Sequence, residues 1–558
     1  MKKQTLLFTL ALVVLTFFGC KPPKEFIDNI KATPNPAEYK AGKVEVAFEG
    51  SFPDKYFTKN MTMEVVPVLT TADGKTYRAA AVKYQGEKVK GNDNVIKYKV
   101  GGKYSQTAVW DYVDGMESSV ITLEATVQVG TKEPYKLDAI EVAKGVNITP
   151  LLVSMQPATG DLTAVVTPDK FQRIIEEKTD AQIKFLVNQA NVRNSEVKTE
   201  EVVALTKAIE AAKKAENREL KGLAINSYAS PEGELDFNEK LSGNRGKNSE
   251  RYINQQLKKF KAEVAIDSKT TAEDWEGFQR LVEASSIEDK ALILRVLSMY
   301  SDPAQREKEI RNMAVAYKAI DETILPELRR SKFQLTVNVI GKSDAEIDSL
   351  AKVAPAQLNV EELLYAATLT EEMNAKKAIY LKATELYAQD YRSFNNLGVV
   401  YYELGNVAEA GRAFAQALRL NANDAAVNFN NGLVALAKGD VAKAEEFFGK
   451  AGGVGEGLNY ANGVIAITKG DYKRAAQLFG NSATNNAALA NILNKNNGAA
   501  RKALDNVQAP NATTAYLKAI VGARTNDAEL YKANIIEAQK DAELKARADK
   551  DVEFTNMK

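Results

Sequence analysis

The sequence predicts a multidomain protein with an N-terminal β-sandwich, a central α/β domain and a C-terminal α-solenoid. Three patterns carry this prediction. Up to about residue 150, apolar and polar residues alternate in short runs, which is typical of half-buried strands. Strand-like and helix-like segments then alternate up to residue 341. From residue 353 onward, helical segments recur at a nearly constant spacing, as in stacked repeats.

The composition excludes several classes of function. The 558 residues include 74 basic and 73 acidic ones, so the chain lacks the positive charge that nucleic-acid binding needs. It contains no His and one Cys, which excludes disulfides, Cys/His zinc sites and His-dependent nucleophiles. We therefore expect no cofactor, no metal and no enzymatic activity. A hydrolase that uses two facing carboxylates is the remaining catalytic alternative.

Residues 1–19 have the pattern of a signal peptide. Lys2 and Lys3 precede an apolar run, Leu6–Phe18, which is shorter than the roughly 20 residues of a membrane-spanning helix. The run ends in Phe17-Phe18-Gly19-Cys20, which resembles a bacterial lipoprotein signal. The resemblance implies cleavage before Cys20 and acylation of its thiol, for example with palmitate, and so a lipid anchor. The alternative is a plain secretory signal with an incidental Cys.

The residues after Cys20 indicate on which face of the membrane the protein would lie. Lys21-Pro22-Pro23-Lys24 contains no acidic run. In bacteria that export lipoproteins to the cell surface, the export signal resembles an acidic patch at this place. We therefore expect the periplasmic face of the outer membrane.

Residues 20–150 are expected to form the β-sandwich. Val44, Val46 and Phe48 alternate with polar or small residues, and Asp73-Gly74 is typical of a hairpin turn. The further predicted strands are Met61–Leu69, Thr76–Tyr84, Val95–Val100 and Ser119–Val129. The region is rich in aromatic residues, which indicate either core packing, the interpretation that we favour, or a sugar-binding platform. They are Tyr77, Tyr84, Tyr98, Tyr104, Trp110 and Tyr112.

Residues 151–182 are predicted to be a connector, because they contain Pro157, Gly160 and Pro168. Residues 183–341 then predict strands and helices in alternation. The expected strands are Ile183–Val187, Leu223–Tyr228, Val264–Ile266 and Phe333–Ile340, and the expected helices are Glu201–Ala212, with Thr199 as its N-cap, and Phe237–Phe260.

The second of these helices carries a motif. Phe237-Asn238 is followed by Leu241-Ser242 and by Arg245, which resembles the Tyr-Asn-x-x-Leu-Ser-x-x-Arg of the peptidoglycan-associating OmpA family. The preceding turn differs from the family, because Ser230 stands at the position of its Asp and Ser227 at that of its first Gly.

The resemblance implies that Arg245 grips a carboxylate of the peptidoglycan stem peptide through two parallel hydrogen bonds. Ser230 would accept a hydrogen bond, Glu232 would supply the missing negative charge, and Asn238 would belong to the same site. The alternatives are a surface Arg245 paired with a Glu on its helix, and an Asn238 that bonds local backbone.

An insertion of about residues 270–326 interrupts the central domain. Trp275, Phe278, Leu281 and Val282 are spaced for one face of a helix. The insertion is either a packing elaboration or a surface for a partner, and the sequence leaves both open. Residues 341–353 are expected to be a polar linker.

Residues 353–545 contain a repeated pattern. Gly398, Ala410 and Phe414 recur 34 residues later as Gly432, Ala444 and Phe448, and again 31 residues later as Gly463, Ala475 and Phe479. The pattern resembles tetratricopeptide repeats, which stack into a solenoid with a concave, protein-binding face. Asparagines recur on the first helices, where they would either clamp a peptide backbone or simply be exposed or close the preceding turn. They are Asn395, Asn396, Asn428, Asn430, Asn431, Asn459 and Asn462.

The sequence thus predicts a lipid-anchored outer-membrane scaffold that binds peptidoglycan, weakly or in a modified way, and a protein partner in its repeat groove. The alternative is an accessory subunit of a secretion, fimbrial or transport assembly, in which the OmpA-like fold is only a scaffold.

Overall fold

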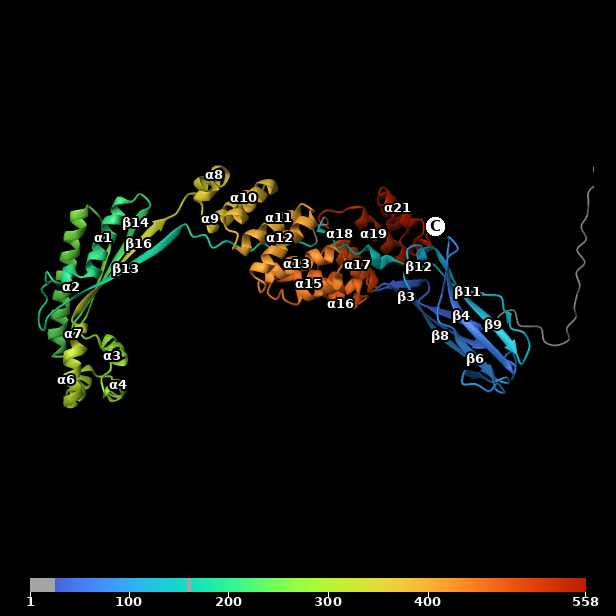
Figure 1. The fold of residues 1–558 in the computed structure, drawn as a ribbon, viewed down its shortest axis with the longest axis horizontal. Coiled ribbons are helices and arrows are strands. Elements are labelled where there is room, and N and C mark those ends of the chain that lie inside the picture. The colour runs from blue at the N-terminus through green and yellow to red at the C-terminus, as the bar shows by residue number, and fades with distance from the viewer. Residues whose placement is uncertain (1–25, 158–161, 558) are drawn as a thin grey trace, which may run out of the picture. The chain divides into compact units, whose positions relative to one another are not determined.

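The computed structural model describes residues 26–157 and 162–557, so the expected signal peptide and Cys20 lie outside the described residues. The described chain forms two compact units (Figure 1). Unit 1 contains the residues up to Pro168 and those from Glu372 on, and unit 2 runs from Asp169 to Glu371. No helix in the described part of the chain has the length and apolar character needed to cross a membrane.

The N-terminal region of unit 1 consists of two β-sheets around one core. One sheet contains β1 (Asp28–Thr33), β2 (Ala37–Lys40), β3 (Lys43–Phe52), β8 (Gly102–Asp111) and β12 (Val146–Asn147). The other contains β4 (Met61–Thr71), β5 (Thr76–Arg78), β6 (Val82–Gly86), β7 (Asn94–Ile96), β9 (Ser119–Val129), β10 (Tyr135–Lys136) and β11 (Ile140–Lys144). Alternate residues of both sheets, such as Val46 and Leu123, share one hydrophobic core.

Most predicted strands of this region are present. The predicted hairpin is made by β4 and β5, which pair across Asp73-Gly74. The predicted strand Val95–Val100 is too long, because only β7 forms and Val100 is 73% exposed. Tyr84, Tyr104 and Trp110 are buried, so these three aromatic residues pack in the core rather than form a platform.

Unit 2 is built on a four-stranded sheet. Its strands are β13 (Ile174–Lys184), β16 (Arg330–Ile340), β14 (Arg218–Tyr228) and β15 (Ile266–Thr271), in that spatial order, and only β14 and β15 pair in parallel. Helices α1 (Glu200–Lys214) and α2 (Leu235–Phe260) pack on one face of this sheet (Figure 1). The expected stripe of α1 is buried as predicted, from Val202 to Ala212.

Two strands begin earlier than expected, and a predicted cap differs. β13 starts at Ile174, inside the predicted connector, because its main chain pairs with β16 along its whole length although its side chains there are exposed. β14 likewise starts at Arg218. Thr199 is the N-cap residue of α1, but its hydroxyl donates to the carbonyl of Glu196 rather than capping the helix.

The insertion is helical, as expected, and has a core of its own. It contains α3 (Trp275–Ala284), α4 (Lys290–Met299), α5 (Pro303–Asn312), α6 (Ala314–Thr323) and α7 (Leu325–Leu328). Unit 2 ends with α8 (Asp344–Val353) and α9 (Val360–Ala366). The expected polar linker was wrong, because α8 occupies it. Ser343 and Glu346 form a capping box, and Ile347 and Ala351 are buried.

The C-terminal part of unit 1 is a stack of antiparallel helix pairs. The helices are α10 (Met373–Leu386), α11 (Tyr391–Glu403), α12 (Val407–Leu420), α13 (Ala425–Ala437), α14 (Val441–Phe448), α15 (Glu456–Thr468), α16 (Tyr472–Phe479), α17 (Asn485–Leu493), α18 (Asn497–Asp505), α19 (Ala512–Thr525), α20 (Ala528–Ala538) and α21 (Ala542–Ala548). Phe448 of α14 lies against Gly432 of α13, and the same contact recurs between Phe414 and Gly398. Helix pairs of this kind bury a core only by stacking.

Candidate functional site

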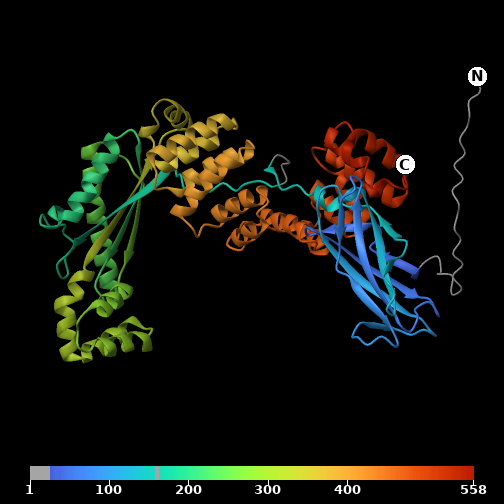
Figure 2. The ribbon, with the colours of Figure 1, turned by 45° about the vertical axis from the view of Figure 1, so that its right-hand side comes forward.

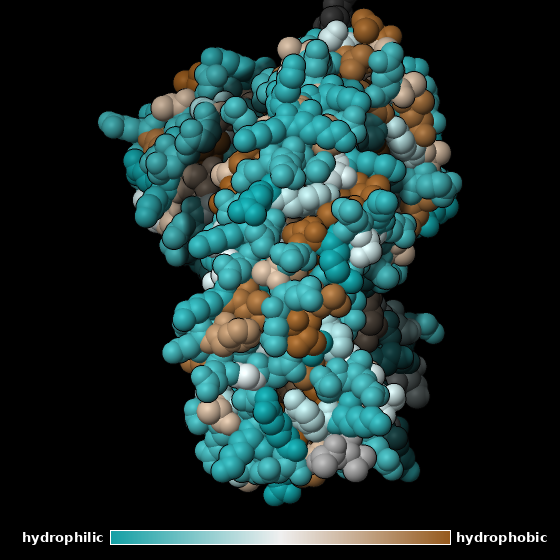
Figure 3. All heavy atoms as spheres, turned by 90° about the vertical axis from the view of Figure 1, so that its left-hand side faces the viewer, coloured by the Kyte–Doolittle hydropathy of each residue, from teal (hydrophilic) through white to brown (hydrophobic). Residues whose placement is uncertain are grey.

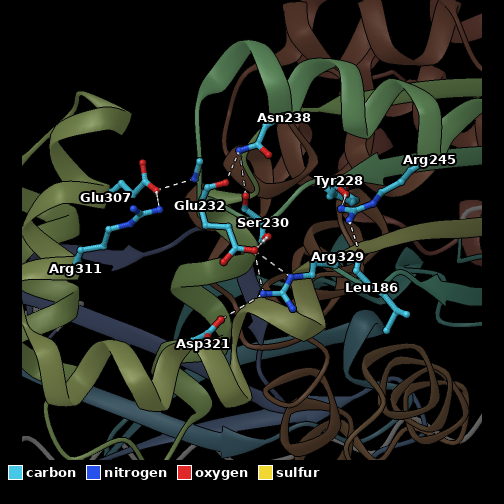
Figure 4. A network of polar contacts seen from close by, with 11 residues as sticks. Leu186, Tyr228, Ser230, Glu232, Asn238, Arg245, Glu307, Arg311, Asp321 and Arg329 are labelled. Carbon is cyan, nitrogen blue, oxygen red and sulfur yellow. Dashed lines mark hydrogen bonds and ion pairs between the residues drawn. The ribbon is translucent and has the colours of Figure 1, made fainter. Parts of the chain in front are cut away.

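The arginine predicted to hold a ligand is buried in unit 2. Arg245 lies on α2 and is 1% exposed. Its guanidinium donates from Nε to the carbonyl of Gln189 (3.0 Å), from Nη1 to that of Tyr228 (2.9 Å) and from Nη2 to that of Leu186 (3.2 Å). It also lies over the ring of Phe185, with 5.2 Å from Cζ to the ring centroid. Figure 4 shows the guanidinium beside the main-chain groups of Leu186 and Tyr228.

This environment corrects the prediction for Arg245. Burial, with the nearby Arg329 charge, lowers the pKa of Arg245 to about 10, against the opposing effect of Glu232. The side chain joins the ends of β13 and β14 to α2 and does not face solvent, so it is not placed to grip an external carboxylate. The expectation of a surface Arg paired with a Glu of its own helix is wrong for the same reason.

The other three predicted site residues lie together, Ser230 and Glu232 in the turn before α2 and Asn238 in the first turn of that helix (Figure 4). Ser230 is buried, and its hydroxyl donates to a carboxylate oxygen of Glu232 (2.9 Å). Asn238 is buried as well, and its Nδ2 donates to the carbonyls of Ser230 (3.3 Å) and Glu232 (2.9 Å). Asn238 therefore bonds local backbone, which was the alternative to a ligand-binding role.

Glu232 has its charge partner inside the protein. Arg329 donates to its Oε1 from Nε (3.2 Å) and from Nη2 (2.9 Å). The helical insertion also contacts the turn before α2, because Glu307 of α5 accepts a hydrogen bond from the main-chain N–H of Gly233 (2.7 Å). Sequence reasoning missed both groups, since they are 97 and 74 residues away along the chain.

The surface of unit 2 has two open pockets, one lined by residues such as Asp180 and Lys332 and the other by residues such as Asn248 and Arg251. Figure 3 shows one face of the molecule, on which hydrophobic residues form separate small patches among hydrophilic ones. Among the described residues, no group of three or more His, Cys, Asp or Glu side chains is placed to hold a metal ion.

In unit 1, three asparagines stand at the same position of their helix pairs. Each lies ten residues before the Asn or Asp that caps the second helix of its pair. We call these three residues the Asn ladder: Asn396 on α11, Asn430 on α13 and Asn486 on α17. At the equivalent position of α15 the chain has Ala461.

The Asn ladder binds main chain from the same protein. The side-chain oxygen of Asn396 accepts from the N–H of Thr167 (2.9 Å), and its Nδ2 donates to the carbonyl of Thr167 (2.9 Å). Asn430 makes the same pair of bonds with Val165 (both 2.8 Å). Asn486 makes it with Ser154 (both 2.9 Å). In Figures 1 and 2 the connector that contains Ser154, Val165 and Thr167 runs along the first helices of the array.

A family model for the tetratricopeptide repeat matches residues 391–424, which are α11, α12 and the turn to α13. The C-terminal helices are a tetratricopeptide-repeat array. Two similar solved structures are a tetratricopeptide repeat protein from Parabacteroides merdae and pilF of Pseudomonas aeruginosa. The first is 16% identical over 35% of this chain and 84% of its own, and the second 14% identical over 36% and 93%, each with a TM-score of 0.28. A search of curated protein sequences finds no match.

The seven predicted groove asparagines have different roles in the tetratricopeptide array. Asn395 joins the ladder by donating to the carbonyl of Val165 (3.0 Å). Asn428 donates to carbonyls of the turn before α13, Asn431 donates to those of Phe414 on α12 and Val427 on its own helix, and Asn459 is exposed. Asn462 is half-buried on α15. The prediction of a backbone clamp thus describes Asn395, Asn396 and Asn430, but they hold this chain's own connector. The prediction missed Asn486.

A second contact holds the β-region to the array within unit 1. Glu553 lies in the C-terminal segment and accepts hydrogen bonds from Asn147 Nδ2 (2.8 Å) and Thr149 Oγ1 (2.9 Å). Arg524 of α19 pairs with the same carboxylate, with 2.9 Å from Nε to Oε2. The C-terminal segment is therefore packed on the array, because Phe554 is buried and Glu553 links three segments.

Proposed function

We propose that this protein is a lipid-anchored, non-catalytic interaction scaffold of the bacterial cell envelope. The single observation that carries the proposal is the tetratricopeptide array with its Asn ladder, because such an array is a surface for protein chains and offers no catalytic group. The chain contains no His, and its single Cys follows an apolar run of signal-peptide type. Acylation of Cys20 would place the scaffold on the outer membrane, on its periplasmic face.

We further propose that unit 2 is an OmpA-like domain that serves as a scaffold rather than as a peptidoglycan binder. Its order of strands and helices and the α2 motif support the family resemblance. The family's arginine position is filled by Arg245, whose three donor nitrogens bond main-chain carbonyls. Glu232 is paired with Arg329. These contacts favour an accessory subunit of an envelope assembly over a protein that grips the cell wall.

Labelling and fractionation test the anchor. We expect radiolabelled palmitate to be incorporated into the wild-type chain and the protein to partition into the detergent phase. The Cys20→Ser variant should carry no label and remain in the aqueous phase. A wild-type protein that is unlabelled and aqueous would contradict the lipid anchor.

Crosslinking and sedimentation test the scaffold. Mild crosslinking in cells, followed by purification from membranes, should recover specific protein partners. Purified sacculi should retain no more of the full chain carrying Cys20→Ser than of an unrelated protein. Retention above that level, lost on Glu232→Ala but kept in the exposed control Glu263→Ala, would overturn the assignment of unit 2 as a scaffold.

A further inference from the structure

The Asn ladder recognises mainly the main chain of its occupant, and Asn396 also accepts a hydrogen bond from the hydroxyl of Thr167 (2.8 Å). Each of its three members uses one amide oxygen and one amide nitrogen to bond the N–H and the carbonyl of a single residue. This is the pairing that one strand offers another in a β-sheet. The bonds to Ser154 and Val165 reach only the backbone, so they set no requirement on those two side chains, apart from Pro, which has no N–H. At Thr167 the side-chain hydroxyl adds one hydrogen bond.

The bound segment has the alternation of an extended chain. Val165 and Thr167 lie two residues apart, and both bond the ladder. The side chain of Val166, between them, is 49% exposed. Successive residues of an extended chain point to opposite sides, so alternate residues face the array. The occupied site is therefore shaped for an extended peptide.

We propose that connector residues 153–157 and 162–167 are a built-in occupant of the tetratricopeptide groove, and that the groove binds an extended peptide of another protein only after this occupant has left. The inference rests on the proposed interaction role of the array. A segment tethered to its own site is present at an effective concentration of the order of millimolar. A free peptide that makes the same main-chain bonds must compete with that concentration, so the closed state dominates until a partner with additional contacts arrives.

Hydrogen exchange on the full chain tests whether the connector occupies the groove. The amides of Val165 and Thr167 should exchange slowly, because each donates to an Asn side chain, and in an Asn396→Ala/Asn430→Ala variant they should exchange much faster. An Asn459→Ala variant is the control, since Asn459 is exposed and lies outside the ladder. Unprotected amides in the wild-type chain would overturn the proposal.

A peptide-binding experiment tests the groove. The probe is a fluorescent synthetic peptide with the sequence of residues 162–168. Val165→Pro removes the N–H that donates a hydrogen bond to the side-chain oxygen of Asn430, and it changes no residue of the groove. We expect this variant to bind the probe about ten-fold or more tightly than the wild-type chain does. Val166→Pro is the matched control and should bind the probe as the wild type does.

Two results would overturn the closed-groove proposal. One is equal binding of the probe to Val165→Pro, Val166→Pro and the wild type. The other is tighter binding by Val165→Pro that persists when Asn396→Ala and Asn430→Ala are added, because the probe would then bind elsewhere. Neither result touches the proposed envelope scaffold, which membrane fractionation and crosslinking measure separately.

Discussion

At the residue scale, an arginine can either bind an external ligand or stabilise the fold, depending on the groups that surround its guanidinium. An arginine whose guanidinium N–H groups face solvent can bind an external carboxylate. The guanidinium of Arg245 instead donates to the carbonyls of Leu186, Gln189 and Tyr228. Hydrogen bonds from a charged group are each worth about 1.5–3 kcal/mol, and a buried carbonyl left unpaired adds a desolvation penalty. Arg245 is therefore expected to stabilise unit 2.

We expect Arg245→Ala to lower the free energy of unfolding of unit 2 by about 3 kcal/mol or more, because three buried carbonyls lose their donor. Native-state hydrogen exchange of amides in β14 and α2 measures this. The control is Arg251→Ala on the same helix, where an exposed side chain is removed and a change within about 0.5 kcal/mol is expected. Equal effects of the two substitutions would contradict the structural role of Arg245.

At the element scale, the two helices of a pair pack closely where a glycine of the first helix contacts a phenylalanine of the second. A Cβ added at Gly432 would lie 2.4 Å from Cε1 of Phe448, which is shorter than any ordinary contact. Gly498, on α18, has no atom nearer than 4.0 Å to the same added group. The two glycines therefore differ in their surroundings although both are helical.

Gly432→Ala should destabilise unit 1 by about 1–3 kcal/mol through overpacking, measured by urea unfolding of the array. Gly498→Ala should be neutral or stabilise it by up to about 1 kcal/mol, because alanine favours the helix and meets open space. If both substitutions stabilised the array, the close contact with Phe448 would not restrict the helix pair.

At the scale of the whole molecule, distant segments of unit 1 meet at one buried carboxylate. Burial alone would raise the pKa of Glu553, but hydrogen bonding and charge pairing with Arg524, and the bonds from Asn147 and Thr149, lower it below its usual value. Near the unperturbed glutamate pKa of about 4.3, the folded chain then binds fewer protons than the unfolded chain. Its stability is complete above that pH and falls as acid protonates Glu553.

We expect unit 1 to be less stable at pH 4 than at pH 7, partly because of Glu553. The variant Glu553→Gln leaves Arg524 without its charge partner and should cost about 3 kcal/mol at pH 7, measured by urea unfolding. The difference between wild type and variant should shrink on acidification, since protonation neutralises the wild-type carboxylate as well. A difference that is independent of pH would contradict the lowered pKa.

The parts of the fold that local patterns encode were predictable. The alternation of Val44, Val46 and Phe48 requires only a half-buried strand, and the stripe on α1 only an amphipathic helix. The start of β13 was missed, since residues such as Glu176 and Lys178 carry no apolar pattern and are held in the sheet by main-chain bonds to β16. Residue types located the candidate sites at Arg245 and at the groove asparagines. They did not predict which groups of the same chain these side chains bond.

The sequence by itself determined that the chain has a β-rich start, an α/β centre and a repeated helical end, because hydrophobic spacing and turn residues act over a few positions. Only the tertiary structure decided that Arg245 faces inward and that the Asn ladder is already occupied. These facts depend on hydrogen bonds between residues far apart in the chain, such as Thr167 and Asn396, which are 229 positions apart. No local pattern encodes such a pair, since an Asn in a groove looks the same in sequence whether its ligand is another protein or its own connector.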